Sequence, residues 1–230
     1  MTQLKSLPEY IEKFPENLTI SEDKLIITET LNTANIHLTN GAKATIVALL
    51  TTGWTDEQFL KFHLQGNDCE LNFIGLIIGK DKNTFPFQTE SIHEVPNTRA
   101  YYYIRGVQFD QAFVKYRGCL IIKPGAQITD AYLGHHTLML SKNAKVETIP
   151  SLEIEADDVK AGHAATLGRV DEETLHYMQS RGLDRRTAQD MLIKGFIEAD
   201  LHRIPSESAR IALMTAIEET LTGLISQKSF

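Results

Sequence analysis

Residues 24 to 160 form a succession of short stretches rich in Val, Ile, Leu, Thr and Tyr, with little of the three-and-four spacing of helices. Corners of one composition separate these stretches. Each has Gly or Asn, then Ala, then a polar residue, at 40–44, 124–128 and 142–146. The turns of this segment therefore repeat in composition, and few folds require turns that repeat in this way.

A β-sandwich also needs many turns, but it does not readily explain matching corners or stretches such as "ATIVALL" that are apolar throughout. Stacked coils whose strands pair in parallel explain both features. We therefore expect a mainly β chain with some α structure, built on a parallel β-helix (a β-solenoid) of roughly six or seven coils with ~20 residues each.

The pattern changes after residue 168, where helix signals begin. Asp171 and Asp184 are residues that cap helices, and Gly182 is a typical residue just past a helix end. Apolar residues then recur at three- and four-residue intervals on both sides of Pro205. These signals predict a β-helix followed by about three helices. The expected parts are an N-terminal segment at 1–23, a parallel β-helix at 24–168 and a C-terminal helical domain at 169–230.

Composition limits the partners of the chain. A net charge of −7 argues against nucleic acid or an anionic membrane surface. No apolar run approaches the ~20 residues of a membrane span, and the first residues lack the apolar part of a signal peptide. We therefore expect a cytoplasmic protein that binds neither nucleic acid nor membrane.

The two cysteines and the motif search exclude several chemistries. Cys69 and Cys119 form no CxxC pair, so a disulfide framework or a zinc knuckle is not expected, and both are predicted to be core residues. No glycine-rich phosphate loop is present, so the chain is not expected to bind ATP by itself. A metal shared by His135 and His136 is also disfavoured, because neighbours on a strand point to opposite faces.

Two readings remain open for the polar residues near 153–163. The carboxylates at 153, 155, 157 and 158 line a solvated strand face, or else a sugar-cleaving groove for which aromatic platforms are sparse. His163 lies among Gly162, Ala164 and Ala165, which leave its imidazole accessible. It is either a structural histidine or a ligand for iron or zinc.

The stretch 151–196, "SLEIEADDVKAGHAATLGRVDEETLHYMQSRGLDRRTAQDMLIKGF", resembles the C-terminal core of the SufB/SufD family of iron–sulfur cluster assembly proteins. The similarity extends upstream to about residue 91. This resemblance implies a right-handed parallel β-helix followed by a C-terminal helical domain. It also implies a complex with a Suf-type ABC ATPase, and cluster assembly near the interface between two β-helix subunits.

Carried over residue by residue, the resemblance singles out His163, which matches a histidine implicated in assembly and would serve as cluster-assembly and metal ligand. His93, Asp157 and Asp158 are possible supporting residues, and His93 is more simply structural. Two positions depart from the pattern. Ala144 and Ala161 stand where many members carry cysteine.

Iron–sulfur clusters are usually held by thiolates, so a chain without those cysteines is expected to supply only half of a site. The resemblance is therefore SufD-like. The cluster would be transient and shared with a partner subunit, and none would be stably bound by the isolated chain.

Together these points predict a non-catalytic scaffold subunit and not an enzyme. Its partners would be a Suf-type ABC ATPase and either a SufB-like paralogue or a second copy in a homodimer. An adaptor or regulator of the ATPase or paralogue, with no ligand role, is the alternative, and a carbohydrate-active β-helix is a third. The residues expected to contact the ATPase are Tyr177, Arg181, Gly182, Met191, Gly195 and Phe196.

Overall fold

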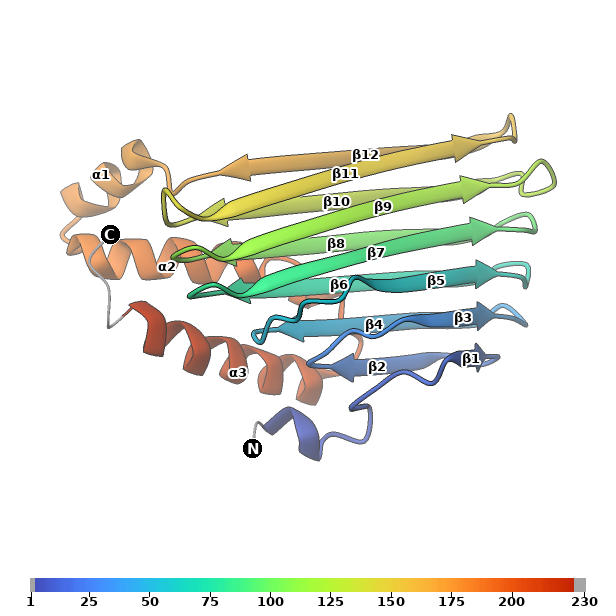
Figure 1. Ribbon diagram of the computed structural model, residues 1–230, viewed down its shortest axis with the longest axis horizontal. Coiled ribbons are helices and arrows are strands. Elements are labelled where there is room, and N and C mark those ends of the chain that lie inside the picture. Colours follow the sequence, from blue (N-terminus) through green and yellow to red (C-terminus); the bar gives the residue numbers. More distant parts are fainter. Residues whose placement is uncertain (1–2, 226–230) are drawn as a thin grey trace.

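The computed structural model describes residues 3–225 of the chain (Figure 1). Its strands are β1 (Asn17–Ile20), β2 (Lys24–Thr28), β3 (Ala34–Leu38), β4 (Lys43–Leu50), β5 (Gln58–Leu64), β6 (Glu70–Gly79), β7 (Thr84–His93), β8 (Arg99–Gln108), β9 (Phe113–Ile122), β10 (Thr129–Met139), β11 (Lys145–Ile154) and β12 (Val159–Gly168). The helices are α1 (Glu172–Ser180), α2 (Arg185–Glu198) and α3 (Glu207–Ile225), with short 3₁₀ helices at Gln3–Ser6 and Leu201–Arg203.

The strands form two parallel sheets, each with six strands within the described residues. The odd sheet has the order β1-β3-β5-β7-β9-β11, and the even sheet has the order β12-β10-β8-β6-β4-β2. Each turn of the chain adds one strand to each sheet, and Figure 1 shows the turns stacked from β1 and β2 up to β11 and β12. The predicted parallel β-helix with a helical region after it is therefore confirmed.

The repeated corners share one local conformation, which also occurs at Ala112, in a corner that the composition did not single out. Ala42, Ala112 and Ala126 are buried, and the backbone N–H of each donates to the carbonyl oxygen three residues earlier. Asn40 and Asp110, which lie two residues before the alanine, have positive φ angles of 55° and 51°. Asn and Asp tolerate this left-handed conformation, and only a small side chain fits where the chain turns back into the interior.

The coils are longer than predicted and begin earlier. Lys24 pairs with Ala44, 20 residues later, but Arg99 pairs with Asp130, 31 residues later. The expected length of ~20 residues holds only for the first coils, because the strands grow from 4 residues in β1 to 10 in β6 and 11 in β10. β1 already pairs with β3, so the solenoid starts before residue 24.

The helices cover the outer face of the even sheet. Ile74, Leu76 and Ile78 of β6 point away from the solenoid interior and join one apolar cluster with Ile193 and Ile197 of α2. This second core explains why β4 and β6 are apolar almost throughout, since both of their faces are buried. On the odd sheet only one face is buried, and β7 alternates strictly.

An ion-pair cluster joins the solenoid to the helices. Arg105 of β8 donates to the buried Asp200 carboxylate at 2.6 Å, and Arg203 donates to its other oxygen at 3.0 Å. Burial of Asp200 acts to raise its pKa, but the two guanidinium groups outweigh that effect and the pKa is lowered. Arg203 also lies 3.9 Å from the centre of the Tyr103 ring. The region after Glu198 is thereby held against the even sheet.

The helix caps confirm the predicted boundaries. The Asp171 carboxylate accepts from the Thr174 N–H at 2.9 Å, and Asp184 accepts from Thr187 at 3.0 Å. Gly182, with φ of 93°, follows the end of α1. No helix within residues 3–225 is long and apolar enough to cross a membrane.

Candidate functional site

His163 lies in the middle of β12, the last strand of the even sheet. It pairs with Leu133, which is fully buried in the solenoid core, so the His163 side chain lies on the inward side of the sheet. It is nevertheless exposed, because β12 belongs to the last coil and no further strand of residues 3–225 stacks on it. The imidazole is therefore accessible.

The last coil leaves an apolar surface uncovered, which we call the open end. Ile154 pairs with the buried Ile122 and Leu167 pairs with the buried Thr137, yet their side chains are 45% and 47% exposed. Within residues 3–225, β11 and β12 each pair on one side only. The inward residues of this coil, which define the open end, are Val146, Thr148, Pro150, Leu152, Ile154, Val159, Ala161, His163, Ala165 and Leu167.

A polar layer lies directly beneath the open end. The buried His135 shares one hydrogen bond with Thr148 at 2.9 Å and another with Thr137 at 3.2 Å. Burial lowers the pKa of His135 to about 4, so its imidazole is neutral at pH 7. The hydroxyl of Thr148, which belongs to the open end, is thus held by a neutral imidazole below it. No motif or spacing in the sequence indicates the hydrogen bond between His135 and Thr148, because the two residues meet only when the strands pack together.

His135 and His136 point to opposite faces, as their adjacency predicted. His136 is on the outer face of the even sheet, where its ring shares a hydrogen bond of 2.7 Å with Thr166. The two imidazoles cannot bind one metal ion from opposite faces. Within residues 3–225, no group of three His, Cys, Asp or Glu side chains is placed to hold a metal ion.

The possible supporting residues are not gathered around His163. His93 is fully buried in the odd sheet, where it pairs with Leu64 and Ile122 and shares a hydrogen bond of 2.8 Å with Thr98. Its Nε2 atom has no partner, and burial lowers its pKa to about 4. His93 therefore lies inside the solenoid, below the last coil.

Asp157 and Asp158 are exposed in the corner between β11 and β12. The Asp158 N–H donates to the Gln127 side chain at 2.9 Å, and its carbonyl oxygen accepts from Ile128 at 2.6 Å. These contacts hold the last corner onto the previous one. Asp158 thus has a structural contact through its backbone, and its carboxylate does not take part in it.

The two alanines that stand where the resemblance expects cysteine, Ala161 and Ala144, lie in different parts of the last coil. Ala161 is on the inward side of β12, two residues before His163, and Ala144 is buried in the corner before β11. A thiol at 161 would share the open end with the imidazole, because residues two apart on a strand share a face.

Cys69 is a core residue as predicted, but the prediction is wrong for Cys119. Cys119 is half-exposed on the outer face of the odd sheet, between Glu90 and Ser151 in register. Burial raises the pKa of its thiol, although the hydrogen bond with Ser151 opposes this effect. Its neighbour Gly118 occupies the inward position on β9. A Cβ atom added at Gly118 would come within 2.3 Å of the Leu133 side chain.

Most of the residues expected to contact an ATPase lie on the outer surface of α1 and α2. Tyr177 is 59% exposed and Met191 is 51% exposed, and Arg181 lies 5.3 Å from the centre of the Tyr177 ring. Gly182 and Gly195 are exposed as well. Phe196 differs, because it packs against the apolar cluster on the even sheet, with the Arg105 guanidinium 5.1 Å from its ring centre.

Comparison with known proteins gives a consistent result. Residues 24–196 match the family model described as SUF system FeS cluster assembly, SufBD core domain. The iron–sulfur cluster assembly protein SufD of Bacillus subtilis (strain 168) is 35% identical over 143 residues, which are 62% of this chain and 33% of that protein. An iron–sulfur cluster assembly SufBD family protein of Mycobacterium leprae is 32% identical over 71% of this chain and 43% of its own length.

The SufD protein of Escherichia coli (strain K12) is 34% identical over 50% of this chain and 27% of its own length. The chain therefore spans between 27% and 43% of the length of these three curated relatives. The matched region contains all of β2–β12, α1 and most of α2, so it includes the open end and His163.

Proposed function

Since this chain belongs to the SufBD core family of the SUF system, we propose that it is a scaffold subunit of an iron–sulfur cluster assembly complex. The cluster is the cargo of that complex, and it is built between two solenoids. The observation that carries the proposal is the position of His163, an accessible imidazole on the inward side of a coil that no other described strand or helix covers. An imidazole in this position is suited to bind iron.

The other ligands come from a second subunit in this proposal. Cys69 is enclosed in the core and Cys119 is on the outer face of the odd sheet, so neither thiol lies on the inward side beside His163. Thiolates are the usual ligands of iron–sulfur clusters. The apolar open end and the unpaired edges of β11 and β12 suit contact with another solenoid, either a SufB-like paralogue or a second copy.

A Suf-type ABC ATPase is the third component. The exposed apolar side chains of Tyr177 and Met191 favour a protein contact on α1 and α2, with Arg181 beside them. In this arrangement the helices receive the ATPase in the cytoplasm while the open end faces the second solenoid. The chain contributes binding surfaces and one ligand, and it carries out no catalytic step itself.

Ala161 favours a second candidate function. A methyl group occupies the open end two residues before His163, where a thiol would complete a pair of ligands. This favours an adaptor that joins the ATPase to a paralogue and has no ligand role. The adaptor needs the helices and the open end, but it does not need the imidazole.

The test is a His163→Ala variant, purified in complex with the Suf-type ATPase and the SufB-like paralogue of the same organism. Because the site is framed by small residues, the variant should assemble and melt normally, and its iron and acid-labile sulfide content should fall several-fold. Lys160→Ala, on the same strand, is the matched control. Normal iron and sulfide in the His163→Ala complex would favour the adaptor. Failure of the unaltered chain to join the complex would contradict both functions.

A further inference from the structure

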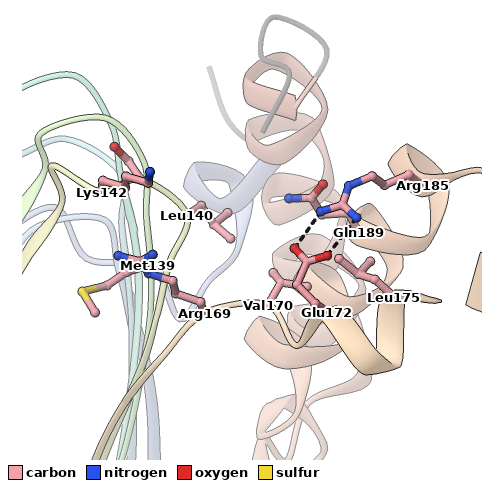
Figure 2. Close-up of a pocket in the computed structure, with 10 residues that line it drawn as sticks. Met139, Leu140, Lys142, Arg169, Val170, Glu172, Leu175, Arg185 and Gln189 are labelled. Carbon is pink, nitrogen blue, oxygen red and sulfur yellow. Dashed lines mark hydrogen bonds and ion pairs between the residues drawn. The ribbon is translucent and has the colours of Figure 1, made fainter. Parts of the chain in front are cut away.

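A cavity of about 410 Å³ lies where the solenoid meets α1 and α2 (Figure 2). Figure 2 shows Leu140, from the end of the solenoid strands, and Leu175 and Gln189, from the helices, on opposite sides of it. Val170, in the link between β12 and α1, completes an apolar floor. A volume of this size is within the range of sites that hold a small molecule.

Gln189 is an uncharged polar residue of the cavity lining. It is only 8% exposed, and its side chain makes no hydrogen bond to another described residue. The Gln189 amide does not belong to the fully enclosed side-chain atoms that lack a partner, so it reaches the open space of the cavity. A ligand in the cavity can therefore hydrogen-bond to it in place of water.

The rim of the cavity is positively charged. Arg185 donates to both carboxylate oxygens of Glu172, at 2.7 and 2.9 Å, so these two charges offset each other (Figure 2). Lys142 and Arg169 remain, and neither forms an ion pair with another described residue. Two free cations beside one cavity are notable in a chain with a net charge of −7, and they favour an anionic group.

We propose that this cavity binds a small amphipathic anion, with an apolar body and one carboxylate or phosphate head. The apolar body packs between Leu140 and Leu175, the Gln189 amide bonds to a polar atom of the ligand, and Lys142 and Arg169 hold the head. The site is separate from the open end, and its occupation does not depend on the role of the chain in cluster assembly.

The test compares octanoate with octan-1-ol, which has the same apolar body without the charge. Each is titrated into the isotope-labelled full chain while the side-chain amide signal of Gln189 is followed by NMR. Octanoate should shift that signal and bind at least ~tenfold more tightly than octan-1-ol. The double variant Lys142→Glu, Arg169→Glu should weaken octanoate ~tenfold or more and leave octan-1-ol unchanged, as expected for loss of about 1.4 kcal/mol of charge attraction.

Lys13→Glu with Lys24→Glu makes the same change in net charge at exposed sites at the first end of the solenoid, away from the cavity, and should bind octanoate normally. Equal binding of octan-1-ol and octanoate, equal weakening by both double variants, or an unchanged Gln189 signal would overturn the proposal. A third probe, the blocked peptide acetyl-Leu-Leu-Asp-amide, separates the source of the anion. Binding of this peptide without binding of octanoate would assign the cavity to a protein segment and contradict a small-molecule site.

Discussion

Three histidines on the inward side of this solenoid have very different surroundings. His93 and His135 are buried, and burial lowers the pKa of each to about 4. His163 belongs to the same inward set but stands on the last coil, where it is exposed. The residue type is the same in each case. The number of coils stacked above it decides whether the imidazole is a neutral core group or an accessible ligand.

The buried histidines make stability dependent on pH. The unfolded chain binds a proton at each histidine below its ordinary pKa of 6.5, whereas the folded chain does so only near pH 4. Stability is therefore complete above pH 6.5 and is lost as pH falls toward 4. For His93 the loss between pH 7 and pH 5 should be about 2 kcal/mol.

Replacing His93 by Leu, which matches Leu64 and Ile122 on either side, should remove about half of this pH dependence. The remainder belongs to His135. Urea unfolding at pH 7 and pH 5 measures the difference for the original chain and the variant. An unchanged pH dependence in His93→Leu would show that this imidazole is not the titrating group.

At the scale of the elements, the local signals were sufficient for the type of structure. The caps at Asp171 and Asp184 and the corner alanines act through contacts a few residues away, so the sequence alone predicts them. The length of each coil could not be predicted, because it depends on which residues pair across 20 to 31 positions. The apolar runs in β4 and β6 were also ambiguous, since a second core under the helices produces them.

The candidate site was predictable only in part for the same reason. The resemblance singled out His163, but its exposure follows from the end of the stack, which no spacing reveals. The position of Cys119 was predicted wrongly, and the packing of Phe196 against the even sheet was not foreseen, because a strand or helix residue can face either of two cores or solvent. The face that such a side chain takes depends on contacts with residues that are distant in sequence, such as Leu133 and Arg105.

The helices are needed to cover the even sheet. A chain that ends at Val170 would expose the outward side chains of β4 and β6, among them Val47, Leu49, Ile74, Leu76 and Ile78. Each is worth ~1.5–3 kcal/mol when buried, so the total is of the order of the whole stability of a domain. We expect the truncated chain to aggregate, as measured by size-exclusion chromatography with light scattering.

A monodisperse, cooperatively melting truncated chain would contradict this role of the helices. The expected aggregation of the truncated chain also affects how ATPase binding is tested. If the truncated chain fails to bind the ATPase, the cause is either the exposed even sheet or the missing surface of α1 and α2. A single Met191→Glu change at the exposed face of α2 avoids this problem, because the side chain lies away from the apolar cluster.

At the scale of the whole molecule, the two ends of the solenoid differ. At the first end the N-terminal residues cover the coil: Phe14 is buried in the core, the Ile11 N–H donates to Ile27 at 2.8 Å, and Tyr10 forms a bridge with Ile27 (Figure 1). The interior also becomes more polar toward the other end, where Thr89 bonds to Tyr116 and His135 bonds to Thr148. At the first end the chain itself covers the core, although β1 pairs on one side only, whereas at the other end no described residue covers the inward side chains of β11 and β12.

Unpaired strands with exposed apolar side chains favour association through the open end. We expect Ile154→Lys with Leu167→Lys to weaken binding to a second solenoid at least ~tenfold, because each lysine places a charge in the contact and must be desolvated. Sedimentation velocity of the chain alone and of its mixture with the SufB-like paralogue measures this for either kind of dimer. Ile211→Lys with Met214→Lys, at exposed apolar positions of α3, is the matched control.

The control should associate as the original chain does. If both double variants bind equally, the contact lies elsewhere on the molecule. If only the open-end variant fails, His163 is placed at the interface by the same side chains that form it. The imidazole would then be enclosed when the two solenoids associate. The effect of removing the imidazole in His163→Ala could be distinguished from the effect of losing the contact between the solenoids.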